Sequence, residues 1–106
     1  MSWDDGIFFA GVDEADIRRE KAKARELRKS RWWQNKIGEA CCYYCGKHTP
    51  PNQLSMDHVV PLARGGRSTK NNLVACCKEC NNKKKTMLPQ EWQDYMESRR
   101  HEDGRD

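Results

Sequence analysis

The sequence lacks any long hydrophobic run: apolar residues make up 36% of its 106 positions, and charged residues 34%. A membrane-spanning helix needs about 20 consecutive apolar residues, so the pattern excludes an integral membrane protein of that kind. Residues 1–16 also lack any base, whereas a secretory signal peptide begins with basic residues. We therefore expect a cytoplasmic protein that has no membrane partner.

The chain also has little apolar material for a core. A domain of 106 residues buries only a modest part of its surface, and 36% apolar content is low for this length. Such domains usually depend on a metal, on disulfide bonds or on a partner for their stability. The sequence contains six cysteines, and in a reducing compartment paired cysteines bind metals more often than they form disulfides.

Charge is distributed unevenly along the chain. Residues 1–16 contain five acids, whereas residues 17–36 contain nine bases and two acids. A concentrated basic block indicates a polyanionic partner, most simply a nucleic acid, although a solvated helix face is the alternative.

Residues 13–36 contain no proline or glycine, so we predict one helix there. Trp32 and Trp33 at its end are predicted to anchor it on the fold, with stacking on bases as the alternative.

The rest of the chain predicts short alternating elements of an α+β fold. Strands are expected over 54–60 and 73–76, a brief helix over 78–85, and a last helix over 89–100 that begins at a proline. We divide the chain into residues 1–39, an acidic segment followed by the basic helix, and residues 40–106, a compact core with its C-terminal helix.

Two cysteine pairs carry the strongest spacing signal. Cys42 and Cys45 form one C-x2-C pair, Cys77 and Cys80 form another, and 31 residues separate them. Two such pairs can close a tetrahedral Zn²⁺ site made of four thiolates, which leaves no position for a substrate. We therefore predict a structural zinc that contributes on the order of 10 kcal/mol to folding.

Neighbouring residues leave alternatives to this ligand set. Cys41 and Cys76 would each permit a spacing of three residues, and His48 follows the first pair closely enough to replace a thiol. The two-residue spacing is the usual one, so we expect none of the three to be a ligand.

Between and beyond the cysteine pairs, several motifs follow one another in a fixed order. They are C-x2-C at 42–45, D-H-V-V-P at 57–61, R-G-G at 64–66, N-N-L-V-A-C at 71–76 and C-x2-C-N-x2-K at 77–84. This string resembles the HNH endonuclease family over roughly residues 40–88. The resemblance implies a small ββα-metal finger, stabilised here by the four-cysteine zinc site and flanked by the N-terminal basic helix and the C-terminal helix.

The resemblance also implies roles for individual residues. His58 would be the general base that accepts a proton from the attacking water, and Asp57 and Asn81 would hold a divalent ion. Two oxygen ligands suit Mg²⁺ or Mn²⁺ better than zinc. Asn72 would fix the loop between the strands, with Asn71 as its rival for this position. Contacts to DNA are expected from four bases: Arg64, Lys83, Lys84 and Lys85.

The expected activity is hydrolysis of phosphodiester bonds in DNA, with nicking of double-stranded DNA and little sequence specificity. A single active site cuts one strand at a time, and we expect a monomer, with a dimer as the alternative. A zinc-stabilised module that binds nucleic acid without cutting it is the alternative function. A cross-brace interaction domain needs about eight ligands for two zinc ions, and the six cysteines and three histidines do not supply them in the right order.

One geometric question accompanies the proposed site. Neighbouring residues of a strand point to opposite faces, so Asp57 and His58 can serve one phosphate in two ways. Either the strand bends at this point or the phosphate lies across its edge.

Overall fold

The structure is a computed structural model that describes residues 12–104, with side chains up to residue 100. Most of the acidic segment, residues 1–11, therefore lies outside the described residues. The helices and strands are α1 (Glu14–Arg28), α2 (Arg31–Ile37), β1 (Leu54–His58), β2 (Leu73–Cys77), α3 (Lys78–Lys84) and α4 (Pro89–Gly104), with short 3-10 helices η1 (Pro51–Gln53), η2 (Leu62–Arg64) and η3 (Lys70–Asn72). The predicted α+β fold is confirmed.

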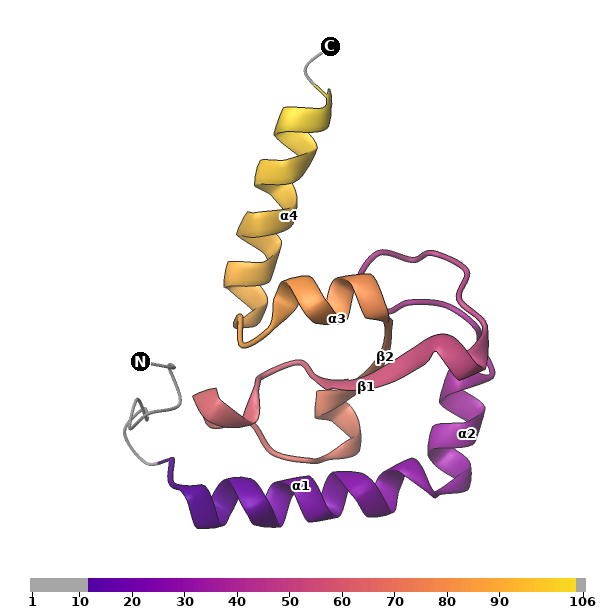
Figure 1. Cartoon of the computed structure of the whole chain (residues 1–106), viewed down its shortest axis with the longest axis vertical. Coiled ribbons are helices and arrows are strands. Elements are labelled where there is room, and N and C mark those ends of the chain that lie inside the picture. Colours follow the sequence, from indigo (N-terminus) through magenta and orange to yellow (C-terminus); the bar gives the residue numbers. More distant parts are fainter. Residues whose placement is uncertain (1–11, 105–106) are drawn as a thin grey trace.

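The centre of the fold is a ββα unit. β1 and β2 pair as an antiparallel sheet in which Asp57 lies opposite Val74 and His58 opposite Leu73. β2 is buried along its whole length, and α3 begins at the residue after it and packs on both strands. Figure 1 shows α3 on one side of the strands and α1 on the other. The end of β1 therefore lies between two helices.

The basic helix is divided in two, so the prediction of one continuous helix over 13–36 was wrong. α1 ends at Arg28 and α2 begins at Arg31. Ser30 causes the break because its side chain accepts a hydrogen bond from Trp33 N (3.2 Å) and donates one to Leu27 O (2.6 Å). A serine that serves as an N-cap competes with the backbone bonds that would continue the preceding helix.

The two neighbouring tryptophans have different surroundings: Trp33 is buried and Trp32 is partly exposed. Trp33 is 5% exposed, and α2 packs against β2, so this residue is the predicted anchor. Trp32 is partly exposed, and Lys36 and Lys70 lie over its ring at 5.4 and 5.7 Å from the centroid.

The loop between the strands turns back on itself at Gly66. A β-carbon at this position would lie 1.7 Å from Val60 O, so the close approach of the two backbones requires glycine. The Gly66 N–H donates to Pro61 O at 2.9 Å. This turn holds the loop against the end of β1.

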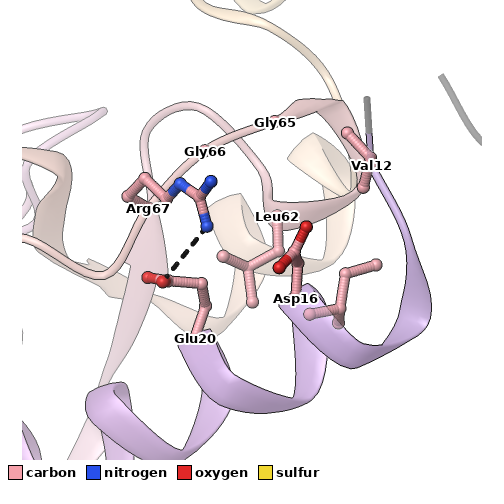
Figure 2. Close-up of a pocket in the computed structure, with 8 residues that line it drawn as sticks. Val12, Asp16, Glu20, Leu62, Gly65, Gly66 and Arg67 are labelled. Carbon is pink, nitrogen blue, oxygen red and sulfur yellow. Dashed lines mark hydrogen bonds and ion pairs between the residues drawn. The ribbon is translucent and has the colours of Figure 1, made fainter. Parts of the chain in front are cut away.

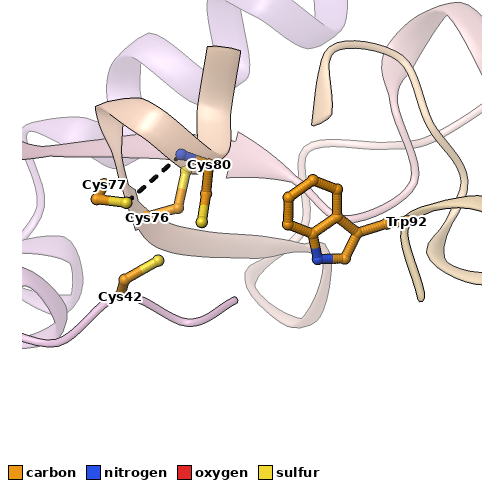
Figure 3. Packing of buried hydrophobic residues seen from close by; sticks show 5 residues of the cluster. All are labelled: Cys42, Cys76, Cys77, Cys80 and Trp92. Carbon is orange, nitrogen blue, oxygen red and sulfur yellow. Dashed lines mark hydrogen bonds between the residues drawn. The ribbon is translucent and has the colours of Figure 1, made fainter. Parts of the chain in front are cut away.

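The core of the described residues is centred on cysteines. Cys42, Cys76, Cys77 and Cys80 form one buried cluster with Trp92 of α4 (Figure 3). From this contact α4 projects away from the body of the molecule (Figure 1). Across the described residues, we find no helix with the length and apolar character that crossing a membrane requires.

Candidate functional site

Four thiols come together where the two C-x2-C pairs meet. The sulfur atoms of Cys42, Cys45, Cys77 and Cys80 all lie within 4.8 Å of one another, and those of Cys45 and Cys77 are 3.9 Å apart. A tetrahedral zinc ion bound at about 2.3 Å requires sulfur atoms roughly 3.8 Å apart. The four cysteines therefore form a cluster that fits a tetrahedral metal such as zinc.

Backbone N–H groups support the same arrangement. Cys45 N donates to the sulfur of Cys42, and Cys80 N donates to that of Cys77, both at 3.5 Å; Figure 3 shows the second bond. Burial opposes ionisation of the Cys42 thiol, but the N–H groups around it lower its pKa to about 7. A lowered pKa favours the thiolate, which is the form that binds a metal, whereas burial raises the pKa of Cys45 and Cys80 and favours their neutral thiols in the absence of an ion.

The alternative ligands lie elsewhere. Cys41 is exposed and its thiol donates to Gly46 O at 3.5 Å, while Cys76 is fully buried outside the group of four sulfur atoms. His48 is exposed and pairs with Cys41 in an isolated β-bridge. The two-residue spacing is therefore the one that the fold brings together.

Asp57 lies near the end of β1 with its two carboxylate oxygens in different surroundings. The hydroxyl of Tyr44 donates to Oδ2 at 2.6 Å, and Lys84 Nζ lies 3.3 Å from the same oxygen. Burial and the Asp57 carboxylate raise the pKa of Tyr44, so this hydroxyl stays protonated and remains a donor. Within the described part of the chain no partner contacts Oδ1, which leaves this oxygen able to bind a ligand.

Lys84 is fully buried, although its position in the motif led us to expect a phosphate contact. Besides Asp57, its Nζ contacts His58 O (3.3 Å) and Val59 O (3.1 Å). Its charge is directed at the end of β1 and away from the surface. Asn81 is three residues earlier on α3, so it shares the helix face that Lys84 turns toward β1.

His58 is held from the other side of β1. Its Nε2 lies 2.9 Å from Ser68 Oγ, and Ser68 Oγ donates to Glu20 O at 2.5 Å. A hydroxyl has one proton to donate, so Ser68 accepts from Nε2–H of His58. This assigns the neutral tautomer in which Nδ1 carries the free lone pair. Burial lowers the pKa of His58 below its ordinary value, which keeps the ring neutral at physiological pH.

Asp57 and His58 thus follow the alternation of a strand. The partners of Asp57 are Tyr44 and Lys84, whereas His58 meets the loop residue Ser68 beside α1. β1 ends at His58, where the chain bends. The two side chains therefore lie on either side of the end of the strand.

Asn72 spans the loop between the strands. Its Oδ1 accepts from Val60 N (2.9 Å), and its Nδ2 donates to Val60 O (3.1 Å) and Arg67 O (2.8 Å). Asn71 is exposed and accepts a bond from Thr69 Oγ1. Of the two neighbours, Asn72 has the contacts that the loop-fixing position needs.

The other bases expected to contact DNA have different surroundings. Arg64 forms a bidentate ion pair with Glu91, both bonds at 3.1 Å, and so ties η2 to the first turn of α4. Lys83 pairs with Glu79 at 3.0 Å on the surface of α3, and Lys85 is exposed just after this helix.

Three residues of the site were missed from the sequence: Tyr44, Ser68 and Glu20. The first two offered no signal, because neither their spacing nor their neighbours mark them. Glu20 could have been found, since it stands at helical spacing between the apolar residues Ile17 and Ala24, on the side of the helix that such spacing turns toward the core.

Comparisons with known proteins agree with this geometry. A family model described as HNH endonuclease matches residues 42–96, which include both cysteine pairs and the whole ββα unit. The CRISPR-associated endonuclease Cas9 of Corynebacterium diphtheriae is 46% identical over 44 residues. That match covers 41% of this chain and only 4% of the relative, so the likeness concerns one segment of a much longer protein.

Proposed function

Because the chain belongs to the HNH endonuclease family, we propose that it is a metal-dependent endonuclease that hydrolyses phosphodiester bonds in DNA. One observation supports this most directly. Among the described residues, no hydrogen-bond partner occupies His58 Nδ1 or Asp57 Oδ1 at the end of β1, and the adjoining face of α3 carries Asn81. This arrangement supports a proton acceptor and oxygen ligands at the end of β1, which phosphodiester hydrolysis requires.

His58 acts as the general base. Its Nε2–H bond to Ser68 turns the lone pair of Nδ1 to the remaining side of the ring, where it accepts a proton from water. Since burial lowers its pKa, the ring is in the accepting form at neutral pH. We favour a phosphate that lies across the end of β1, because Asp57 and His58 have their partners on opposite sides of the strand and the bend follows His58 instead of falling between the two residues.

Asp57 and Asn81 would hold a divalent cation, and their oxygen donors suit Mg²⁺ or Mn²⁺, which when bound would neutralise charge on the phosphate. Tyr44 and Lys84 orient the Asp57 carboxylate through Oδ2. The four cysteines would hold Zn²⁺ in a structural role, because four thiolates complete its coordination. Asn72 keeps the loop closed beside His58.

The exposed bases bind the DNA backbone. Lys85 is exposed just after α3, the partly exposed Lys83 lies in the last turn of this helix, and the outer face of α1 carries further arginines and lysines. Such contacts address phosphates and carry no sequence information, so we expect little specificity. A monomer with one site nicks duplex DNA. Arg64 and Lys84 form ion pairs with Glu91 and Asp57. They therefore support the DNA-binding surface by holding its elements in place and not by direct contacts to phosphates.

The test is cleavage of supercoiled plasmid DNA by the zinc-loaded protein with Mg²⁺ or Mn²⁺. We expect the wild type to produce open circles, His58→Ala to be at least about 100-fold slower, and the exposed control His48→Ala to match the wild type. Cleavage by His58→Ala at the wild-type rate contradicts the assignment of the base. Salt-dependent binding without strand breaks under either ion would identify a non-catalytic binding module instead.

A further inference from the structure

We propose that α1 is part of the active site, with Ser68 and Glu20 as positioning residues for His58. The inference rests on the proposed function of His58 as general base. It extends the site beyond residues 42–96, the segment that the family model matches, to a helix that begins at Glu14.

The evidence is a continuous chain of hydrogen bonds from α1 to the imidazole. Glu20 contacts Ser68 twice: its backbone carbonyl accepts from Ser68 Oγ at 2.5 Å, and its carboxylate Oε1 accepts from Ser68 N at 2.6 Å. Ser68 Oγ in turn lies 2.9 Å from His58 Nε2. Two bonds therefore fix the serine, and the serine fixes the ring.

The burial of Glu20 shows that this contact is specific. The residue is 4% exposed, and a buried carboxylate is costly unless cations and donors surround it. Lys23 and Arg67 lie 3.0 and 3.3 Å from its Oε2, and Figure 2 shows the Arg67 pair joining α1 to the loop. An apolar residue would suffice if α1 only covered the loop.

The direction of the bonds is also informative. Because the Ser68 proton goes to Glu20 O, Ser68 can only accept from His58, which selects the Nε2–H tautomer. The opposite tautomer would place two lone pairs against each other. The helix therefore determines which ring nitrogen is available to water.

This arrangement couples the position of α1 to the rate of the chemical step. Small misplacement of a catalytic group can lower the rate by about 100-fold without weakening substrate binding. A change in the Ser68 contact should accordingly lower kcat and leave KM unchanged. A purely structural role would instead lower stability and leave the activity of the folded fraction intact.

The experiment compares Ser68→Ala with Thr69→Ala in the full, zinc-loaded chain. Thr69 is the neighbouring residue of the same loop, and its exposed hydroxyl contacts Asn71. We expect Ser68→Ala to lower kcat by roughly 10- to 100-fold at constant KM and zinc content, and Thr69→Ala to match the wild type. Equal kcat values for the two variants would overturn the proposal.

Nitrogen NMR of the ring gives a readout that does not depend on activity. The ¹⁵N shifts of neutral His58, identified by their loss in His58→Gln, should report the Nε2–H tautomer in the wild type and a mixture in Ser68→Ala. A mixture in the wild type would refute the inference even if Ser68→Ala failed to fold.

Glu20 is tested by a conservative pair. Glu20→Gln keeps an oxygen that accepts from Ser68 N and should retain most of kcat, whereas Glu20→Ala keeps only the backbone carbonyl that accepts from Ser68 Oγ and should lower kcat, though less than Ser68→Ala does. Equal activity of these two variants would remove the Glu20 side chain from the positioning contacts and leave only its backbone carbonyl. If His58→Ala is inactive while Ser68→Ala is fully active, the proposed function stands and only this inference fails.

Discussion

At the scale of single residues, the Asp57 carboxylate has one oxygen bonded to the protein and one that no other described residue contacts. Oδ2 accepts from Tyr44 and faces Lys84. Tyr44 belongs to the first cysteine pair, and its ring packs edge-on against Trp92 with centroids 5.4 Å apart. The thiol cluster thus determines where the Tyr44 hydroxyl lies, and the hydroxyl determines how Asp57 is turned.

This contact predicts that Tyr44→Phe weakens binding of the divalent ion. The variant keeps the ring packing but loses the donor to Oδ2, and the loss of such supporting bonds typically lowers metal affinity by roughly 10-fold. Calorimetric titration of the zinc-loaded protein with Mn²⁺ measures the effect. Tyr43→Phe is the matched control, because Tyr43 is 62% exposed. Unchanged Mn²⁺ affinity in Tyr44→Phe would show that the bond does not orient Asp57.

Glu20 predicts a specific pH dependence of stability. The N–H of Ser68 and the nearby cations lower the pKa of its carboxyl in the folded protein. The stabilisation is therefore fully present above the ordinary glutamate pKa of about 4.3 and is lost as the pH falls through the lower folded value. The difference in unfolding free energy between the wild type and Glu20→Gln should be constant near neutrality. It should shrink as the pH falls below the ordinary glutamate pKa of about 4.3. Denaturant titrations at several pH values measure it, and a difference that is constant at every pH would contradict the assignment.

At the scale of elements, α1 has two functional faces. The buried face carries Glu20 and Ala24, and the exposed residues include Arg18, Lys21 and Arg25. Arg28 Nη1 lies 3.8 Å from Met56 Sδ, which places this end of the helix beside β1. Since Met56 and His58 are two residues apart on one strand, the bases of α1 lie on the side of the general base.

Neutralising the exposed bases of α1 tests its DNA-binding face separately from its buried face. Deleting the helix would not do so, because the deletion would also remove Glu20. The triple variant Arg18→Gln, Lys21→Gln, Arg25→Gln should bind DNA more weakly, and the salt dependence of its affinity should be shallower. Each lost phosphate contact reduces the slope of log K against log salt by about 0.9. Fluorescence anisotropy with a labelled duplex measures the slope.

Glu39→Gln, on an exposed residue just after α2, serves as the control for a charge change outside this face. An unchanged slope in the triple variant would leave α1 with the positioning role alone.

At the scale of the whole molecule, the proposed metal centre and the core are one structure. The buried cluster around the thiols consists of cysteines and Trp92, which joins α4 to the ββα unit. Without a bound ion, four neighbouring thiolates cannot serve as an apolar core. Folding and metal binding should therefore be coupled, as in other small domains with four-cysteine sites.

Removal of the metal by a strong chelator should thus unfold the protein, and adding back Zn²⁺ should restore it. Circular dichroism and metal content measured on the same samples follow both changes. Cys80→Ser should behave like the chelated protein, whereas Cys41→Ser should retain zinc, since Cys41 is exposed outside the cluster. A native spectrum after complete loss of metal would show that the core is sufficient without it.

Local residue patterns were enough to predict most of the elements and the chemistry that depends on spacing. Two C-x2-C pairs specify a ligand set because each pair is local, and only their meeting requires the fold. Both strands and the short helix α3 were predicted to within two residues, whereas the last helix extends beyond its predicted end to Gly104. The break between α1 and α2 at Ser30 was missed. A serine with good helix formers on both sides can lie inside one helix or cap the start of another, and the sequence does not distinguish the two cases.

Only the tertiary structure decided which residues support the site. Lys84 turned inward to Asp57, Tyr44 reached the same carboxylate, and Ser68 joined His58 to a residue 48 positions from itself. Such contacts join segments far apart in the chain, and residue order records neither the direction of a side chain nor the partner it meets. Local spacing therefore identifies the groups that carry the chemistry, and packing between distant segments positions them.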